Sequence, residues 1–304
     1  MINRADAARA LAQDSALLEV AAVLHADAVP YLLLKGRASA DLLGTSVYRL
    51  SSDVDLLVPP GRYGQARRVL SCLDYQDVLG AARPHEQMTF ESTWRRGVAT
   101  VDLHRTLHGV VDGELVWAVF SETPDTVVVG GQEFRCGNRA VRLFHLALHL
   151  AQSTGHSEAR TRQELAHAVS LLPVTAFERA LVVADRLGAR DLFTVALQRA
   201  GAGALCAELG LDGRPGSDRA AAVLAGRSLT VHAVERLSTL PWVERPAFVL
   251  RQLTPSRAII GQHLPPGRRR RGALAGAYVR RLQVGAGRTV RLLRDRRDAG
   301  GAAR

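Results

Sequence analysis

The chain has 304 residues, a formal net charge of +11 at pH 7 and an apolar fraction of 47%, which are values typical of a folded globular protein. Acidic residues at Asp6, Asp14 and Glu19 argue against a secretory signal. No stretch approaches the roughly 18 uninterrupted apolar residues that a membrane span needs. Three widely spaced cysteines without a CxxC pair argue against a disulfide framework and a zinc site. We therefore expect a cytoplasmic protein without a transmembrane segment.

Apolar periodicity and turn residues predict a mixed first part of the chain. In order, they predict a helix over about 5–28, a strand over 31–34, a short helix over 36–44, a strand over 53–58 and a helix over 62–75. Two hairpins are expected after these elements. The first joins strands 86–94 and 97–104 at a bend of Arg95, Arg96 and Gly97, and the second spans 125–137 around Gly130 and Gly131.

Strand signals stop near residue 138, and helical segments follow. Breaks between these segments are expected near Gly155, Pro173, Gly188, Gly210 and Pro241. The fold class predicted from this order is α+β, with a small mixed sheet followed by an all-helical C-terminal half. The predicted domains are an α/β domain over 1–137, a helical domain over 138–264 and an arginine-rich extension over 265–304.

The positive charge is concentrated at the C-terminus. Twelve arginines and two aspartates from residue 268 to 304 account for +10 of the net charge, so the rest of the chain is nearly neutral. Residues 268–297 could follow a nucleic-acid backbone, lie on an anionic membrane surface or form an extension that aids solubility or pairs with an acidic partner. Nucleic acid is not favoured, because Tyr278 is the only aromatic residue among these arginines.

Two aspartates stand two residues apart in the stretch LSSDVDLLV, residues 50–58. On a strand, Asp53 and Asp55 project from one face, and their repulsion needs compensation. A third aspartate, Asp102, lies in the later predicted strand TVDLH. Such a trio can hold two divalent cations that clamp the attacking and leaving oxygens of a phosphoryl transfer. We expect Asp53 and Asp55 to bridge Mg²⁺ or Mn²⁺, and Asp102 to complete the catalytic metal and help draw the acceptor proton.

Lys35 is the only lysine among the 40 basic residues that are Lys or Arg. It follows an apolar strand and precedes Gly36, which allows a close approach of backbone N–H groups to an anion. Chance can place a single lysine here, but a site that prefers a compact ammonium to a forked guanidinium is the more specific interpretation. We expect Lys35 and Gly36 to contact the triphosphate of a nucleoside triphosphate (NTP).

The order LLLKG, R-x-S-S-D-V-D-L-L-V and V-D-L-H resembles the DNA polymerase beta-like nucleotidyltransferase superfamily. Within it, the chain resembles the bacterial branch labelled the uncharacterised nucleotidyltransferase family, whose helical half begins as LFHLALHLAQ does at 143–152. The resemblance implies metal ligands at Asp53, Asp55 and Asp102. It also implies contacts with the nucleotide phosphates at Lys35, Gly36, Arg49 and Ser52. The chain departs from the family pattern at two places. Its turn is Gly36-Arg37, where the wider superfamily has Gly-Ser or Gly-Gly, and Arg105 follows V-D-L-H, where the narrower family often has Trp.

Three histidines have a second interpretation. His104 shares a strand face with Asp102 and either points into the nucleotide site or is a hydrogen-bonded, half-buried residue. His145 and His149 have the i, i+4 spacing of zinc ligands, but without a third ligand we favour packing.

The function predicted from the resemblance is metal-dependent transfer of a nucleoside monophosphate, or of a related phosphoryl-linked group, from an NTP such as ATP to a hydroxyl acceptor, with release of pyrophosphate. The acceptor can be a small molecule, a protein or a peptide. Two alternatives stay open: a weakly catalytic or non-catalytic partner protein, and an RNA-directed transferase that uses the basic tail.

Overall fold

The computed structural model describes residues 4–44, 53–80, 90–110, 112–153, 156–211 and 241–253, together with residues 237, 276, 278 and 279. Contacts divide the chain into two compact units, Met1–Val78 with Met88–Ala233, and Leu79–Gln87 with Val234–Arg304. The sheet, the helices α1 to α9 and the candidate site all belong to the first unit. Nearly all of the predicted arginine-rich extension lies outside the described residues.

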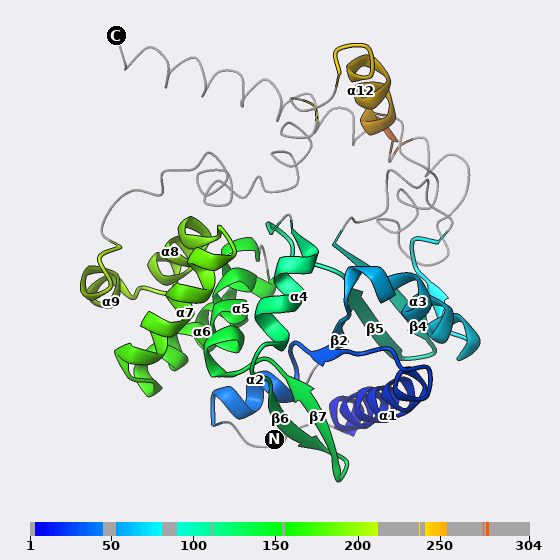
Figure 1. The fold of residues 1–304 in the computed structure, drawn as a ribbon, viewed down its shortest axis with the longest axis horizontal. Helices are drawn as coiled ribbons and strands as arrows, with labels where there is room; N and C mark the ends of the chain where they lie inside the picture. Colours follow the sequence, from blue (N-terminus) through cyan, green and yellow to red (C-terminus); the bar gives the residue numbers. More distant parts are fainter. Residues whose placement is uncertain are drawn as a thin grey trace. The chain divides into compact units, whose positions relative to one another are not determined.

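The first unit contains a mixed sheet of seven strands in the order β3-β4-β5-β2-β1-β7-β6 (Figure 1). Its strands are β1 Leu32–Leu33, β2 Val54–Leu57, β3 Gln76–Asp77, β4 Glu91–Arg96, β5 Ala99–His104, β6 Asp125–Val129 and β7 Gln132–Cys136. The pairs β2–β5 and β1–β7 are parallel, and the other neighbouring strands are antiparallel. The central position of β2 places the Asp55 segment between β1 and β5.

Helices precede, connect and follow the strands. They are α1 Arg4–Ala26, α2 Arg37–Leu42, α3 Tyr63–Cys72, α4 Gly113–Ser121, α5 Arg139–Gln152, α6 His156–Leu171, α7 Val174–Arg186, α8 Arg190–Arg199 and α9 Gly203–Glu208, with the short 3-10 helix η1 Pro60–Arg62 before α3. The second unit contains α12 Arg245–Leu253. No described helix has both the length and the apolar character needed to cross a bilayer.

The predicted α+β fold class is confirmed, and three elements, η1, α4 and β3, were not predicted. The run Leu115–Phe120 is continuously apolar, so α4 shows no helical period in the sequence. Strand β3 has only two residues. The first hairpin turns at Gly97 and Val98, not at 95–97, because Arg96 pairs with Ala99. The predicted strand residues 86–89 lie outside the described residues, and the domain boundaries stay a prediction.

Alternation along the central strands separates two hydrophobic cores. Val54 and Leu56 of β2 belong to the core that α1 and α3 cover, whereas Leu57 belongs to the core formed by α4 to α9. Since side chains two residues apart share a face, Asp55 points to the same side as Leu57, toward the helical half. Figure 1 shows α5 to α8 gathered beside one another and α1 and α3 next to the strands.

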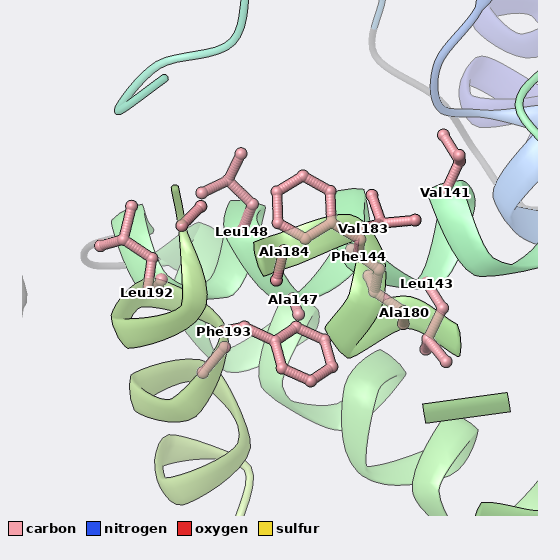
Figure 2. Close-up of a cluster of buried hydrophobic side chains, with 14 of the residues drawn as sticks. Val141, Leu143, Phe144, Ala147, Leu148, Ala180, Val183, Ala184, Leu192 and Phe193 are labelled. Atoms are coloured by element: carbon pink, nitrogen blue, oxygen red, sulfur yellow. The ribbon is translucent and has the colours of Figure 1, made fainter. Parts of the chain in front are cut away.

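Helix α5 is the centre of the helical core, in contact with α6, α7 and α8. Figure 2 shows Phe144 and Ala147 of α5 among side chains of α7 and α8, including Val183 and Phe193. Asn138 caps the start of the helix by accepting a hydrogen bond from the Val141 amide at 3.1 Å. The buried apolar side chains of α5 thus hold this helix in place against α6, α7 and α8.

Arg142 connects α5 with two other elements of the first unit. Its buried guanidinium donates to the Ala38 carbonyl at 3.0 Å and to Asp41 Oδ2 at 2.6 Å, both in α2. It also donates to Asp125 Oδ2 of β6 at 2.8 Å. These charge-assisted bonds hold α2, and with it the Lys35-Gly36 turn, at a fixed place against α5.

Two adjacent valines of α7 test the helical core. Val183 is 7% exposed and faces the cluster, whereas Val182 is 57% exposed. We expect Val183→Ala to lower the free energy of unfolding by about 1–3 kcal/mol through lost burial and a cavity. Val182→Ala should change it by less than about 0.5 kcal/mol, because the Val182 side chain is mostly exposed. Both variants share the same change in helix propensity, so the difference between them reports the burial of Val183. Urea unfolding of the full chain measures both, and equal losses would contradict the packing of α7.

Candidate active site

The parallel pairing of β2 with β5 sets Asp55 directly beside Asp102. Both side chains point toward the helical half, and Asp55 is only 1% exposed. Asp53 comes immediately before β2, two residues from Asp55. Two carboxylates at neighbouring register positions in a buried sheet repel each other. The fold therefore builds a concentrated negative charge into its centre.

Lys35 supplies the nearest compensating charge. The Leu34 amide donates to the Asp55 carbonyl at 3.0 Å, which holds the end of the first strand segment against β2. The chain then turns at Gly36, whose φ of 64° favours glycine. This turn brings the Lys35 ammonium to 2.8 Å from Asp55 Oδ1. The Lys35 side chain is 25% exposed, so it covers Asp55 while it keeps contact with solvent.

His104 is the second partner of Asp55. Its Nε2 lies 3.1 Å from Asp55 Oδ1, and because an ionised carboxylate only accepts, Nε2 carries the proton in this bond. The other ring nitrogen, Nδ1, lies 3.2 Å from Glu91 Oε2. That contact has the distance of an ion pair but not the alignment of a hydrogen bond. His104 thus stands between the carboxylates of Asp55 and Glu91, as the pairing of Glu91 with His104 across β4 and β5 requires.

The two central aspartates have opposite pKa shifts. Burial alone would raise the pKa of Asp55, but the Lys35 ammonium and the hydrogen bond from His104 outweigh it and hold the pKa well below its usual range. The pKa of Asp102 is raised to about 6, mainly by burial and then by the charge of Asp55. The charged form of Lys35 is favoured in turn: burial would lower its pKa, but Asp55 raises it overall. The Lys35 ammonium therefore pairs with Asp55, whereas the hydrogen bond that Asp102 receives from Thr93 does not offset the cost of its burial.

Lys35 and Asp102 line a cavity of about 360 Å³ between the sheet and α5. Its charged and imidazole lining residues are Lys35, Asp53, Glu91, Asp102, His104, His108, His145 and His149. Gln152 and Ser153 extend the polar wall of α5, and Phe90 stacks on His108 with ring centroids 4.8 Å apart. Burial, followed by the charge of Lys35, lowers the pKa of His145 well below its ordinary value, so this imidazole is neutral.

The predicted site residues largely come together. Lys35, Asp53, Asp102 and His104 line the cavity, and Asp55 lies beneath Lys35. Of the two interpretations of His104, the buried, hydrogen-bonded one fits, and the ring also reaches the cavity. Arg49 and Ser52 lie outside the described residues.

Glu91 was not predicted as a site residue, and the histidines of α5 were predicted to serve packing. His145 does pack edge-on against Phe120, with ring centroids 6.2 Å apart, yet His145 and His149 also line the cavity. The predicted hairpin contained Glu91 and His104, but its bend at 95–97 would pair Glu91 with Val101; the observed turn at Gly97 and Val98 is what sets Glu91 opposite His104.

The donor set fits a divalent cation. Asp55 Oδ2 and Asp102 Oδ1 are buried oxygens without a hydrogen-bond partner, and oxygen atoms of carboxylates are the ligands that Mg²⁺ prefers. The described residues nevertheless contain no group of three His, Cys, Asp or Glu side chains already arranged around a metal position. The carboxylates for a metal site are present, and the Lys35 ammonium is paired with the buried one, Asp55.

Comparison with known proteins gives the class of the chain. Residues 2–201 match the family described as "Uncharacterised nucleotidyltransferase", and the chain belongs to that family. The resemblance proposed from the aspartate motifs is thereby confirmed. Comparison with curated protein sequences gives no match.

Solved nucleotidyltransferase structures are distant. The solution structure of the antibiotic-resistance factor ANT(2'')-Ia is 15% identical, with a TM-score of 0.43, over 59% of this chain and 95% of that one. The crystal structure of ANT(2'')-Ia with adenylyl-2''-tobramycin is 14% identical, with the same TM-score, over 57% and 98%. An antigenic nucleotidyltransferase-like protein from Paracoccidioides brasiliensis is 16% identical, with a TM-score of 0.35, over 59% and 93%.

The Lys35–Asp55 pair should be strongly coupled in the metal-free protein. Lys35→Met leaves the buried carboxylate with His104 alone, and we expect it to lower the free energy of unfolding by about 1–3 kcal/mol. Adding Asp55→Asn should recover part of that loss, with a coupling energy of about 0.5–3 kcal/mol. Urea unfolding in the presence of a chelator measures the double-mutant cycle.

An exposed ion pair provides the control for this cycle. Arg190 contacts Asp185 Oδ2 at 2.8 Å, and both side chains are more than 40% exposed. Arg190→Met with Asp185→Asn should give a coupling below about 0.5 kcal/mol. Additive losses at Lys35 and Asp55 would show that the buried pair contributes no more than this surface pair.

Proposed function

We propose that the protein is a metal-dependent nucleotidyltransferase that transfers a nucleoside monophosphate from an NTP to an acceptor hydroxyl, with release of pyrophosphate. One observation carries the proposal. Asp55 and Asp102 lie side by side on parallel strands beneath one cavity, and each keeps a buried carboxylate oxygen without a protein partner. A purely structural sheet has no reason to place two such carboxylates together, because both are costly to bury.

The residues on the sheet and at the Gly36 turn divide into two roles under this proposal. Asp53, Asp55 and Asp102 hold Mg²⁺ or Mn²⁺, which supplies charge neutralisation at the reacting phosphate. Lys35, at the Gly36 turn, contacts the phosphates of ATP or another NTP. Positioning and electrostatic stabilisation account for most of the catalysis in phosphoryl transfer, so the protein needs few further groups.

The acceptor binds against the α5 wall in our proposal. Its hydroxyl must reach the carboxylate cluster, and the opposite wall offers His149, Gln152 and Ser153 as hydrogen-bonding groups. A small molecule, a protein side chain and a peptide all satisfy that requirement. The three cysteines are free thiols, which agrees with the cytoplasmic location that we propose.

Calorimetry with each NTP in the presence of Mg²⁺ or Mn²⁺ tests this function. The wild-type protein should bind at least one NTP in a metal-dependent manner. Substituting Asp53→Asn and Asp55→Asn together should weaken that binding at least tenfold, because the metal ligands lose their charge. Pyrophosphate release on addition of an acceptor would then identify the reaction.

Asp185→Asn is the matched control, since Asp185 is a surface carboxylate of α7 paired with Arg190. Its NTP affinity should equal that of the wild-type protein within about twofold. Absence of NTP binding with either metal would overturn the enzyme proposal. The non-catalytic partner protein would then become the favoured function.

A further inference from the structure

The Lys35 ammonium occupies the place where a cation is needed most. It lies 2.8 Å from Asp55 Oδ1, and the Asp55 side chain is 1% exposed. Lys35 and His104 between them cover this oxygen. A divalent cation that binds Asp55 therefore competes for the carboxylate with a charge that the chain itself provides.

The cavity also provides space into which the Lys35 ammonium can move. Its side chain is 25% exposed and lines the cavity together with Asp53 and Asp102. A lysine stem has four rotatable bonds and a mobile ammonium, unlike the planar fork of arginine. The ammonium can leave Asp55 and enter the cavity without any movement of the backbone.

A chain that needed only a structural counter-ion would leave no carboxylate oxygen unsatisfied beside it. Here Asp55 Oδ2 and Asp102 Oδ1 both stay unpartnered in the buried cluster while Lys35 binds Asp55 Oδ1. One ammonium thus lies beside two neighbouring carboxylates and binds only one of their oxygen atoms directly. The ion pair is a partial substitute for a divalent cation.

We propose that Lys35 is an exchangeable counter-ion: the metal displaces its ammonium from Asp55, and the released ammonium then binds the nucleotide phosphates. This inference rests on the proposed function and adds a coupling to it. Metal binding creates the free cation that the triphosphate requires, so nucleotide without metal meets a Lys35 that is already paired. The metal-free protein keeps its buried carboxylate neutralised until the substrate arrives with its ion.

The sequence offers an exact probe, because Lys35 is the only lysine in the chain. Isotope-labelled lysine gives one side-chain signal in the NMR spectrum of the full-length protein. We expect that signal to stay unchanged on addition of NTP with a chelator, to shift with Mg²⁺ alone and to shift again with Mg²⁺ and NTP. A signal that does not respond to Mg²⁺, or that responds as strongly to metal-free NTP, would overturn the exchange.

Lys35→Met gives a second test, with effects of opposite sign. Removing the competing charge should tighten the binding of Mg²⁺ in the absence of nucleotide by on the order of tenfold or more. The same substitution should weaken the binding of NTP in the presence of Mg²⁺ by about tenfold, since a phosphate contact is lost. A lysine that only binds phosphate would leave the Mg²⁺ affinity unchanged, and one that only supports the fold would weaken both affinities. Either result would overturn the exchange.

Arg37→Met is the matched control. Arg37 is the next cation of the same turn, but its guanidinium bonds to Asp14 of α1, with Nε 3.1 Å from Oδ1. Both affinities should stay within about twofold of the wild-type values. If the Lys35→Met protein does not fold, the lysine signal of the wild-type protein decides the question.

The outcomes separate the two proposals. Metal-dependent binding of NTP with an unmoved Lys35 signal would support the nucleotidyltransferase and overturn the exchange. A signal that moves with Mg²⁺ while no NTP binds would support displacement of the ammonium and overturn the enzyme.

Discussion

The ion pair between Lys35 and Asp55 is the interaction on which the centre of the structure depends. Asp55 lies in a central strand, almost without solvent contact, beside a second carboxylate at Asp102. Charge of this kind is tolerated in a sheet only when it is paired and hydrogen-bonded. The turn at Gly36 that delivers the ammonium is therefore as important to the fold as it is to the site. The side chains of Lys35 and Asp55 thus contribute both to the stability of the sheet and to the proposed site.

The cavity is a product of both halves of the chain. The sheet contributes the carboxylates, and α5 closes the opposite side with a polar face whose other face is the centre of the helical core. Arg142 ties that helix to α2, which begins directly after the Lys35-Gly36 turn. The positions of the ammonium and of the cavity wall are consequently linked through the buried guanidinium of Arg142.

Local sequence predicted what depends on local geometry. Alternation within one strand was sufficient to place Asp53 and Asp55 on one face, and the lone lysine before glycine marked the turn. The contact between Asp55 and His104 was not predictable, because it depends on the register of β2 and β5, which are far apart in the sequence; that register pairs Asp55 with Asp102 and Leu57 with His104, so His104 reaches Asp55 from a diagonal position. The same holds for α5: its period puts His145 and His149 on one side, but only the tertiary packing shows that this side meets the cavity. The helix α4 was missed because its apolar run carries no period.

The two faces of α5 have a consequence for how such proteins can diverge. Phe144, Ala147 and Ala151 hold the helix in the core, whereas His149 and Gln152 project toward the cavity from the adjoining stripe. The side chains that line the cavity are thus distinct from those that fill the helical core. Under the proposed function, a lineage with this architecture could exchange one acceptor for another by altering a few helix positions, while the carboxylates on the sheet are kept.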